Sequence, residues 1–227
     1  MTSTQDVARE LARAGAAPFT AVLADAQSEG RGRMGRTWVS RPSLGLHLSI
    51  VLPPRAGALR GLTLAVALAA RDAIGIPGVL LKWPNDLLAS GRKLGGILVD
   101  AETGPEPSAI LGIGVNLRHV PEDFPGEIRD IATSIAMLGI EPPGPVDLAE
   151  RIVSRCEATL ATLARGGFEP LRSAWLAACA WREGDGVSVR DGGREIRGTF
   201  AGIADDGAIR LREPSGAVVE IRTGEPA

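Results

Sequence analysis

The amino-acid sequence predicts an α+β protein in which a large domain of mixed strands and helices precedes a small domain made of strands. Strand-like and helix-like apolar patterns alternate along residues 3–180. From Gly184 onward only short alternating strands remain, separated by glycine-containing turns and spaced as in a small β-barrel. With 44% hydrophobic residues, the 227-residue chain can build a large core and a small appendage. We expect domains at 1–182 and 183–227.

The first elements are a helix, a strand and a loop. Ser3 or Thr4 can cap a helix whose apolar face begins at Val7, and Gly15 can end it. Residues 20–26 then have the pattern of a strand. The stretch GRGRMGRTW at residues 30–38 holds too many glycines and arginines for a core or a regular element, so we expect a loop there.

The middle of the chain alternates strands with helices. Apolar residues recur at every second position over 46–52, as in a half-buried strand, and residues 59–74 have helical character that stops at Gly75. Further strands are expected at 79–83, 87–89, 95–99 and 109–116, with turns at 84–85 and 90–91. A loop over 118–130 and helices over 148–164 and 168–180 complete the large domain.

Composition excludes several classes of protein. The net charge of −2 leaves no basic excess for non-specific binding to nucleic acid. The longest uncharged apolar run, residues 62–70, is about half the length that crosses a bilayer, and no export signal follows Met1, so a cytoplasmic enzyme is expected. The two cysteines and two histidines show no zinc-ligand grouping, and Cys156 is in phase with apolar helix positions, as in a core.

The loop at residues 30–38 carries the first chemical signal. Its three arginines, Arg31, Arg33 and Arg36, stand among glycines, so guanidinium groups and exposed amides can converge on one anion such as phosphate or carboxylate. The alternative is a solvated basic loop or an RNA-binding tract. No aromatic residue is interleaved before Trp38, and the segment follows a strand rather than a disordered tail, which favours the anion site.

A second signal lies in KWPNDLL at residues 82–88 and KLGGIL at residues 93–98. A hairpin would bring Lys82 and Lys93 near Asp86, a suitable hard ligand for Mg²⁺ where phosphates supply further charge. Gly95 and Gly96 would let a ligand lie against the backbone. The alternative is a surface turn with a core tryptophan and two solvated lysines.

These motifs, followed by GIGVNL at residues 112–117, resemble in order and spacing the biotin protein ligases. STQD at residues 3–6, ATSI at residues 132–135 and the small terminal β domain extend the resemblance over nearly the whole chain. It implies the class II synthetase-like biotin/lipoate ligase fold, with a mixed or antiparallel sheet flanked by helices and an SH3-like barrel. Lipoate ligases share the fold and a lysine but lack GRGRxGR.

The resemblance also implies roles for particular residues. The ureido ring of biotin would be held by Ser3, Thr4, Gln5 and Gln27, with Trp38 and the backbone near Gly96 covering the rest. Lys93, Arg31 and Arg33 would be the catalytic side chains, with Lys93 between the biotin carboxylate and the α-phosphate. The nucleotide and Mg²⁺ would be bound by Arg36, Asn85, Asn116 and Asp86, with Asp86 as the metal ligand. The remaining implied binding residues are Gly30, Gly32, Lys82 and Gly95.

The implied activity is ATP-dependent ligation through biotinyl-5′-AMP, with Mg²⁺, onto a lysine of a biotin carboxyl carrier domain, by a monomer or homodimer. Gln5 departs from the asparagine that relatives usually have. Almost nothing precedes STQD, so no DNA-binding domain and no DNA partner are expected. Lipoate ligation, a non-catalytic binding module and an RNA-binding protein are the competing readings; Lys93 and Asp86 speak against the binding module.

Overall fold

The computed structural model describes residues 1–102 and 108–226 as two antiparallel sheets with four helices. The large sheet has the strand order β1-β2-β6-β5-β4-β3. Its strands are β1 (Ala21–Ala24), β2 (Gly45–Val51), β3 (Leu80–Lys82), β4 (Asp86–Ala89), β5 (Arg92–Glu102) and β6 (Ser108–Asn116). The helices are α1 (Thr4–Arg13), α2 (Leu62–Ile74), α3 (Pro145–Gly166) and α4 (Glu169–Ala177). The α+β class is confirmed.

Local sequence signals explain where several elements begin and end. The backbone N–H of Gln5 donates to Ser3 Oγ at 3.3 Å, so Ser3 caps α1 as expected. Gly75 ends α2 in the left-handed conformation that glycine adopts most readily. Ser90 and Gly91, both with positive φ, form the tight turn between β4 and β5.

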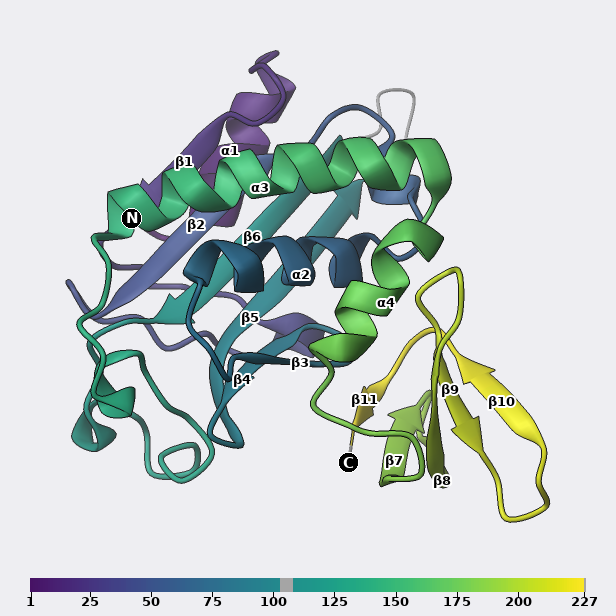
Figure 1. Ribbon diagram of the computed structural model, residues 1–227. Coiled ribbons are helices and arrows are strands. Elements are labelled where there is room, and N and C mark those ends of the chain that lie inside the picture. Colours follow the sequence, from purple (N-terminus) through teal and green to yellow (C-terminus); the bar gives the residue numbers. More distant parts are fainter. Residues whose placement is uncertain (103–107, 227) are drawn as a thin grey trace.

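Helices cover both faces of the large sheet (Figure 1). On one face α3 packs over β2 and α2 packs over β3, β4 and β5, with Leu46, Leu48 and Ile50 in the core between them, and on the other face α1 packs beside Val51. All seven residues of β2 are therefore buried. The prediction of a half-buried strand was wrong. The face of β2 that carries His47 and Ser49 is buried, because it lies beneath α1 and forms part of the wall of the cavity described below.

The small sheet is open. Its strand order is β10-β9-β8-β7-β11, formed by β7 (Gly186–Asp191), β8 (Arg194–Ile203), β9 (Ile209–Arg212), β10 (Val218–Ile221) and β11 (Glu225–Pro226). The expected barrel is thus not closed by hydrogen bonds among the described strands. β11 has only two residues and pairs with β7, while β10 pairs with β9, so the two edges do not meet.

The small sheet packs directly against the large one (Figure 1). Trp83 Nε1–H donates to the carbonyl of Gly207, in the turn between β8 and β9, at 3.1 Å. A Cβ on Gly207 would lie 2.8 Å from the Cα of Gly61, at the start of α2, so this approach requires glycine. Buried residues of both sheets, such as Trp83 and Phe200, belong to one hydrophobic core.

No helix among the described residues is long and apolar enough to span a membrane. Cys156 and Cys179 are buried free thiols, and burial raises their pKa to about 12 and about 11. The core interpretation of Cys156 is confirmed.

Candidate functional site

A cavity of about 220 Å³ lies on the α1 face of the large sheet, beneath the loop at residues 30–38, which we call the arginine loop. Its wall brings together residues from distant parts of the sequence. Most of the predicted site residues contribute to it: Ser3, Thr4, Gln5, Gln27, Arg31, Gly32, Arg33, Arg36, Trp38, Asn85, Lys93, Gly96 and Asn116.

The floor of the cavity is main chain rather than side chain. Gly96 of β5 pairs with Gly114 of β6, and Gly112 lies two positions away on the same face. A Cβ on Gly114 would lie 2.6 Å from Trp38 Cε2, and one on Gly112 would lie 2.6 Å from Gln5 Nε2. Gly112 and Gly114 were not predicted as floor residues, although their spacing of two in GIGVNL indicates that both lie on one face of the strand.

The end of the cavity next to α1 is polar and closely hydrogen-bonded. Thr4 donates to Gln27 Oε1 from its backbone N–H at 2.8 Å and from its hydroxyl at 3.0 Å. The hydroxyl of Ser49, on β2, donates to Thr4 Oγ1 at 2.8 Å. These bonds fix the side chains at this end before any ligand arrives.

Gln5 presents an acceptor at the same end. Its side-chain N–H donates to the carbonyl of Leu98 at 3.4 Å, which orients the amide. Its Oε1 is buried and has no hydrogen-bond partner in the described structure. A buried acceptor without a donor is unfavourable, so a ligand with an N–H group at this end would satisfy it.

The arginine loop folds back on itself as a short hairpin. Arg31 and Thr37 form an isolated antiparallel bridge, and Gly32 N–H donates to the carbonyl of Arg36 at 2.7 Å. Gly30 closes the hairpin, since a Cβ there would lie 2.4 Å from the carbonyl oxygen of Trp38. The loop is thus more regular than its composition indicated, because the bridge requires only backbone atoms.

The three arginines of this loop reach three different elements. Arg31 pairs with Asp6 of α1 at 2.8 Å, and Arg36 pairs with Glu225 of β11. Arg33 Nη1 donates to Asn85 Oδ1 at 3.2 Å. Burial lowers the pKa of Arg33, because the charged guanidinium loses water around it. This half-buried cation faces the cavity and is suited to meet an anion there.

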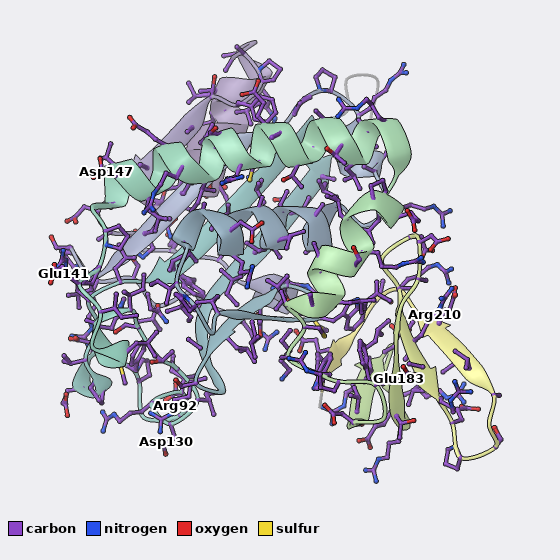
Figure 2. All side chains as sticks on the ribbon, viewed as in Figure 1. Arg92, Asp130, Glu141, Asp147, Glu183 and Arg210 are labelled. Carbon is purple, nitrogen blue, oxygen red and sulfur yellow. The ribbon has the colours of Figure 1, made fainter. Side chains whose placement is uncertain are left out.

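Lys93 lies where the floor meets the hairpin of β4 and β5. Its Nζ is 2.6 Å from Asp86 Oδ1, since β4 and β5 pair side by side with a bulge at Leu87 and Leu88. Its backbone N–H donates to the carbonyl of Ile131 at 2.7 Å, which docks residues 131–133 beside the site. Figure 2 labels Arg92 and Asp130, which precede Lys93 and Ile131 in the sequence, at this end of the molecule.

Four predicted residues, Lys82, Gly95, Gly30 and Asp86, lie outside the cavity wall. Lys82 and Asp86 are cross-strand neighbours, but the Lys82 side chain does not approach Asp86. Its Nζ lies 5.9 Å from the ring centroid of Trp181. The expectation that both lysines meet Asp86 was therefore wrong for Lys82. A Cβ on Gly95 would lie 3.1 Å from Leu87 Cδ1, so Gly95 packs on the core face, and Gly30 belongs to the loop closure.

Asn116 and Asp86 contribute in different ways. Asn116 Nδ2 donates to the carbonyl of Thr133 at 2.9 Å, so this amide holds the ATSI segment while also lining the cavity. Asp86 does not line the cavity. It forms an ion pair with Lys93, which does. No group of three or more metal-ligating His, Cys, Asp or Glu side chains exists among the described residues. One carboxylate beside an amide still fits Mg²⁺, because that ion takes few protein ligands when phosphates provide the rest.

Comparison with known proteins identifies relatives over the whole chain. A family model described as the biotin/lipoate A/B protein ligase family matches residues 1–116, and one described as the biotin protein ligase C terminal domain matches residues 184–225. The biotin--[acetyl-CoA-carboxylase] ligase of Paracoccus denitrificans is 39% identical, over 87% of this chain and 86% of its own. The bifunctional ligase/repressor BirA of Bacillus subtilis is 35% identical, over 99% of this chain and 71% of its own.

A solved structure has the same architecture. The biotin protein ligase from Aquifex aeolicus in complex with biotin and ATP superposes with a TM-score of 0.85 at 28% sequence identity, covering 100% of this chain and 94% of that one. The chain belongs to the biotin protein ligase family.

Proposed function

We propose that this biotin protein ligase activates biotin with ATP to form biotinyl-5′-AMP and then transfers the biotinyl group to a lysine of a biotin carboxyl carrier domain. The observation that supports this proposal is the single cavity, which joins a polar end, a floor of glycine backbone and a cluster of cations. A ring with N–H groups, a flat apolar body and a carboxylate fits these three parts in that order.

Biotin lies with its ureido ring at the α1 end. Gln5 Oε1, which has no partner in the described structure, accepts an N–H of the ring, and Ser3, Thr4 and Gln27 surround it. The fused ring lies beside the Trp38 indole, which packs directly on Gly114. Lipoate has a dithiolane ring without N–H groups and would leave the Gln5 acceptor unsatisfied, so this end favours biotin.

The first reaction joins two anions. When the biotin carboxylate attacks the α-phosphorus of ATP, a like-charge pair ~4 Å apart costs about 4 kcal/mol at an effective dielectric near 20. Lys93 lies where its ammonium group can offset the negative charge of both the carboxylate and the α-phosphate. The guanidinium groups of Arg33 and Arg36 can offset the negative charge of the phosphates. Mg²⁺, held by Asp86 beside Asn85, supplies further positive charge when bound. The C–O–P anhydride forms as the bond to pyrophosphate breaks.

The second reaction needs protection from water. The anhydride is hydrolysed in open solvent, so the arginine loop covers it until the acceptor lysine arrives. A neutral lysine amine attacks the acyl carbon, AMP leaves as the C–O bond of the anhydride breaks, and a carboxylate or phosphate oxygen takes the proton that the amine loses. The acceptor belongs to a biotin-dependent carboxylase, in line with the names of the relatives, and with a net charge of −2 we expect no DNA partner.

The adenylation assay tests this function directly. Purified protein with biotin, ATP and Mg²⁺ is expected to release pyrophosphate and to accumulate biotinyl-5′-AMP, because the cavity holds the adenylate while no acceptor is present. A coupled pyrophosphate assay and thin-layer chromatography of labelled ATP would measure both products. Lipoate in place of biotin is the control, and adenylation of lipoate in preference to biotin would assign the protein to lipoate ligation.

The glycine floor gives a second prediction. Gly114→Ala would place a Cβ 2.6 Å from Trp38 and push the indole into the space for the biotin ring. We expect biotin affinity to fall about ten- to a hundredfold, the effect of forcing extra volume into a packed site. Isothermal titration calorimetry measures this loss. Gly126→Ala is the control, since a Cβ there meets nothing within 4 Å. Equal affinities of the two variants would show that biotin does not rest on this floor.

A further inference from the structure

The outer half of the arginine loop, residues 33–36, is the part of the cavity wall that the fewest contacts hold in place. Met34, at its tip, has a φ of 54° and is 76% exposed. The hairpin bonds described above fix the inner half, and Arg31 ties that half to α1. Within residues 33–36 only Arg36 is joined to the inner half by a backbone hydrogen bond, from Gly32 N–H, and the contacts with other elements are made by the side chains of Arg33 and Arg36.

Two of those contacts come from the last strand of the small sheet. The carboxylate of Glu225 pairs with Arg36, and the carbonyl of Gly224 lies 3.5 Å from both terminal nitrogens of Arg33. The third contact is Asn85 Oδ1, which accepts from Arg33. Thus a segment about 190 positions away in the sequence holds both arginines of the outer half.

The backbone that presents Glu225 is itself held in place. A Cβ on Gly224 would lie 2.7 Å from the carbonyl oxygen of Arg190, so the chain here presses against β7 and requires glycine. Thr223 Oγ1 donates to Asp191 Oδ1 at 2.7 Å. Glu225 and Pro226 then pair with Arg190 and Val189 of β7. These contacts therefore fix the backbone of Glu225, and its carboxylate lies beside the arginine loop.

We propose that Glu225 is a positioning residue, which acts through Arg36 to hold the outer half of the arginine loop over the cavity. The small sheet thereby contributes to the phosphate end of the site without touching substrate. The part of this inference that concerns ATP rests on the proposed function; the part that concerns loop order does not. Glu225 is 28% exposed and Arg36 is 62% exposed, so water screens the pair and its effect is modest.

The first experiment compares Glu225→Gln with the wild-type protein and with Glu183→Gln. Glu183, labelled in Figure 2, is an exposed acid just before β7, so both variants lose one negative charge from the small domain. We expect Glu225→Gln to raise the KM for ATP about two- to fivefold, with the KM for biotin unchanged, because only the phosphate end depends on Arg36. The melting temperature of both variants should match the wild type.

The second experiment uses no substrate. Trypsin can cut after Arg33 and Arg36 only when the loop opens, so the initial rate of cleavage reports the open population. We expect this rate to be about two- to fivefold higher in Glu225→Gln than in the wild type or in Glu183→Gln. An unchanged cleavage rate would overturn the proposal, and so would an unchanged or lowered KM for ATP. If the wild-type protein releases no pyrophosphate at all, the proposed function fails while the cleavage rate still decides the role of Glu225.

Discussion

Replacing Lys93 by alanine is expected to lower the rate of biotinyl-5′-AMP formation by about 10² to 10⁴-fold, the loss seen when one preorganised charge-stabilising group is removed. Lys93 Nζ lines the cavity and lies 2.6 Å from Asp86, so the substitution also leaves that carboxylate without its cation. Single-turnover release of pyrophosphate measures the chemical step without product dissociation.

Lys82→Ala is the matched control for this experiment. Both lysines lie on strands that pair with β4, Lys82 on β3 and Lys93 on β5, but Lys82 lies over the ring of Trp181 outside the cavity. Loss of a partly exposed cation–π contact is worth about 0.5–1 kcal/mol, and only in stability, so adenylation should change less than about fivefold. Equal losses for the two variants, or a larger loss for Lys82→Ala, would show that Lys93 is not the lysine that stabilises the transition state.

Replacing Arg33 by glycine is expected to separate synthesis of the adenylate from its retention. Arg33 bridges the loop tip and Asn85, and its charge is half-buried at the cavity wall. A hydrogen bond to a charged group contributes about 1.5–3 kcal/mol, so biotinyl-5′-AMP should dissociate about ten- to a hundredfold faster. The added glycine also makes the loop entropically harder to order. Arg31→Gly should act in the same direction.

Released adenylate can be detected by its chemistry. The mixed anhydride acylates any neutral amine that it meets before water destroys it, so lysines of a bystander such as albumin should be biotinylated. Streptavidin blotting of albumin measures this labelling. Arg194→Gly, which alters an exposed arginine at the start of β8, controls for the loss of one charge. Labelling by Arg33→Gly no greater than by the control would show that the loop does not retain the intermediate.

The sequence predicted the local features of this protein well. Ser3 as a helix cap, Gly75 as a helix end and the turn at Ser90 and Gly91 depend on neighbouring residues only, and all three are confirmed. The motifs also pointed to most of the cavity wall, because the arginine loop and the β4–β5 hairpin are each continuous in sequence.

Features that depend on distant contacts could not be predicted. Nothing near Glu225 indicates that it meets Arg36, and the polar residues of β2 suggested an exposed face that α1 in fact covers. Lys82 was expected near Asp86 because the two are cross-strand neighbours, but the ring of Trp181 attracts its ammonium group instead. Pairing along a hairpin thus predicts adjacency of backbones and not the direction of a long side chain.

The glycine floor limits how this enzyme can change its substrate over evolutionary time. Gly112 and Gly114 let the Gln5 amide and the Trp38 indole pack directly on the sheet, so a point mutation at either glycine adds bulk that displaces these side chains. The side chains at the cavity wall, Gln5 and Thr4 at the α1 end and Trp38 over Gly114, can be exchanged for others of different size and polarity. New ring specificity is therefore accessible mainly through these side chains, and directed evolution of this scaffold should begin there.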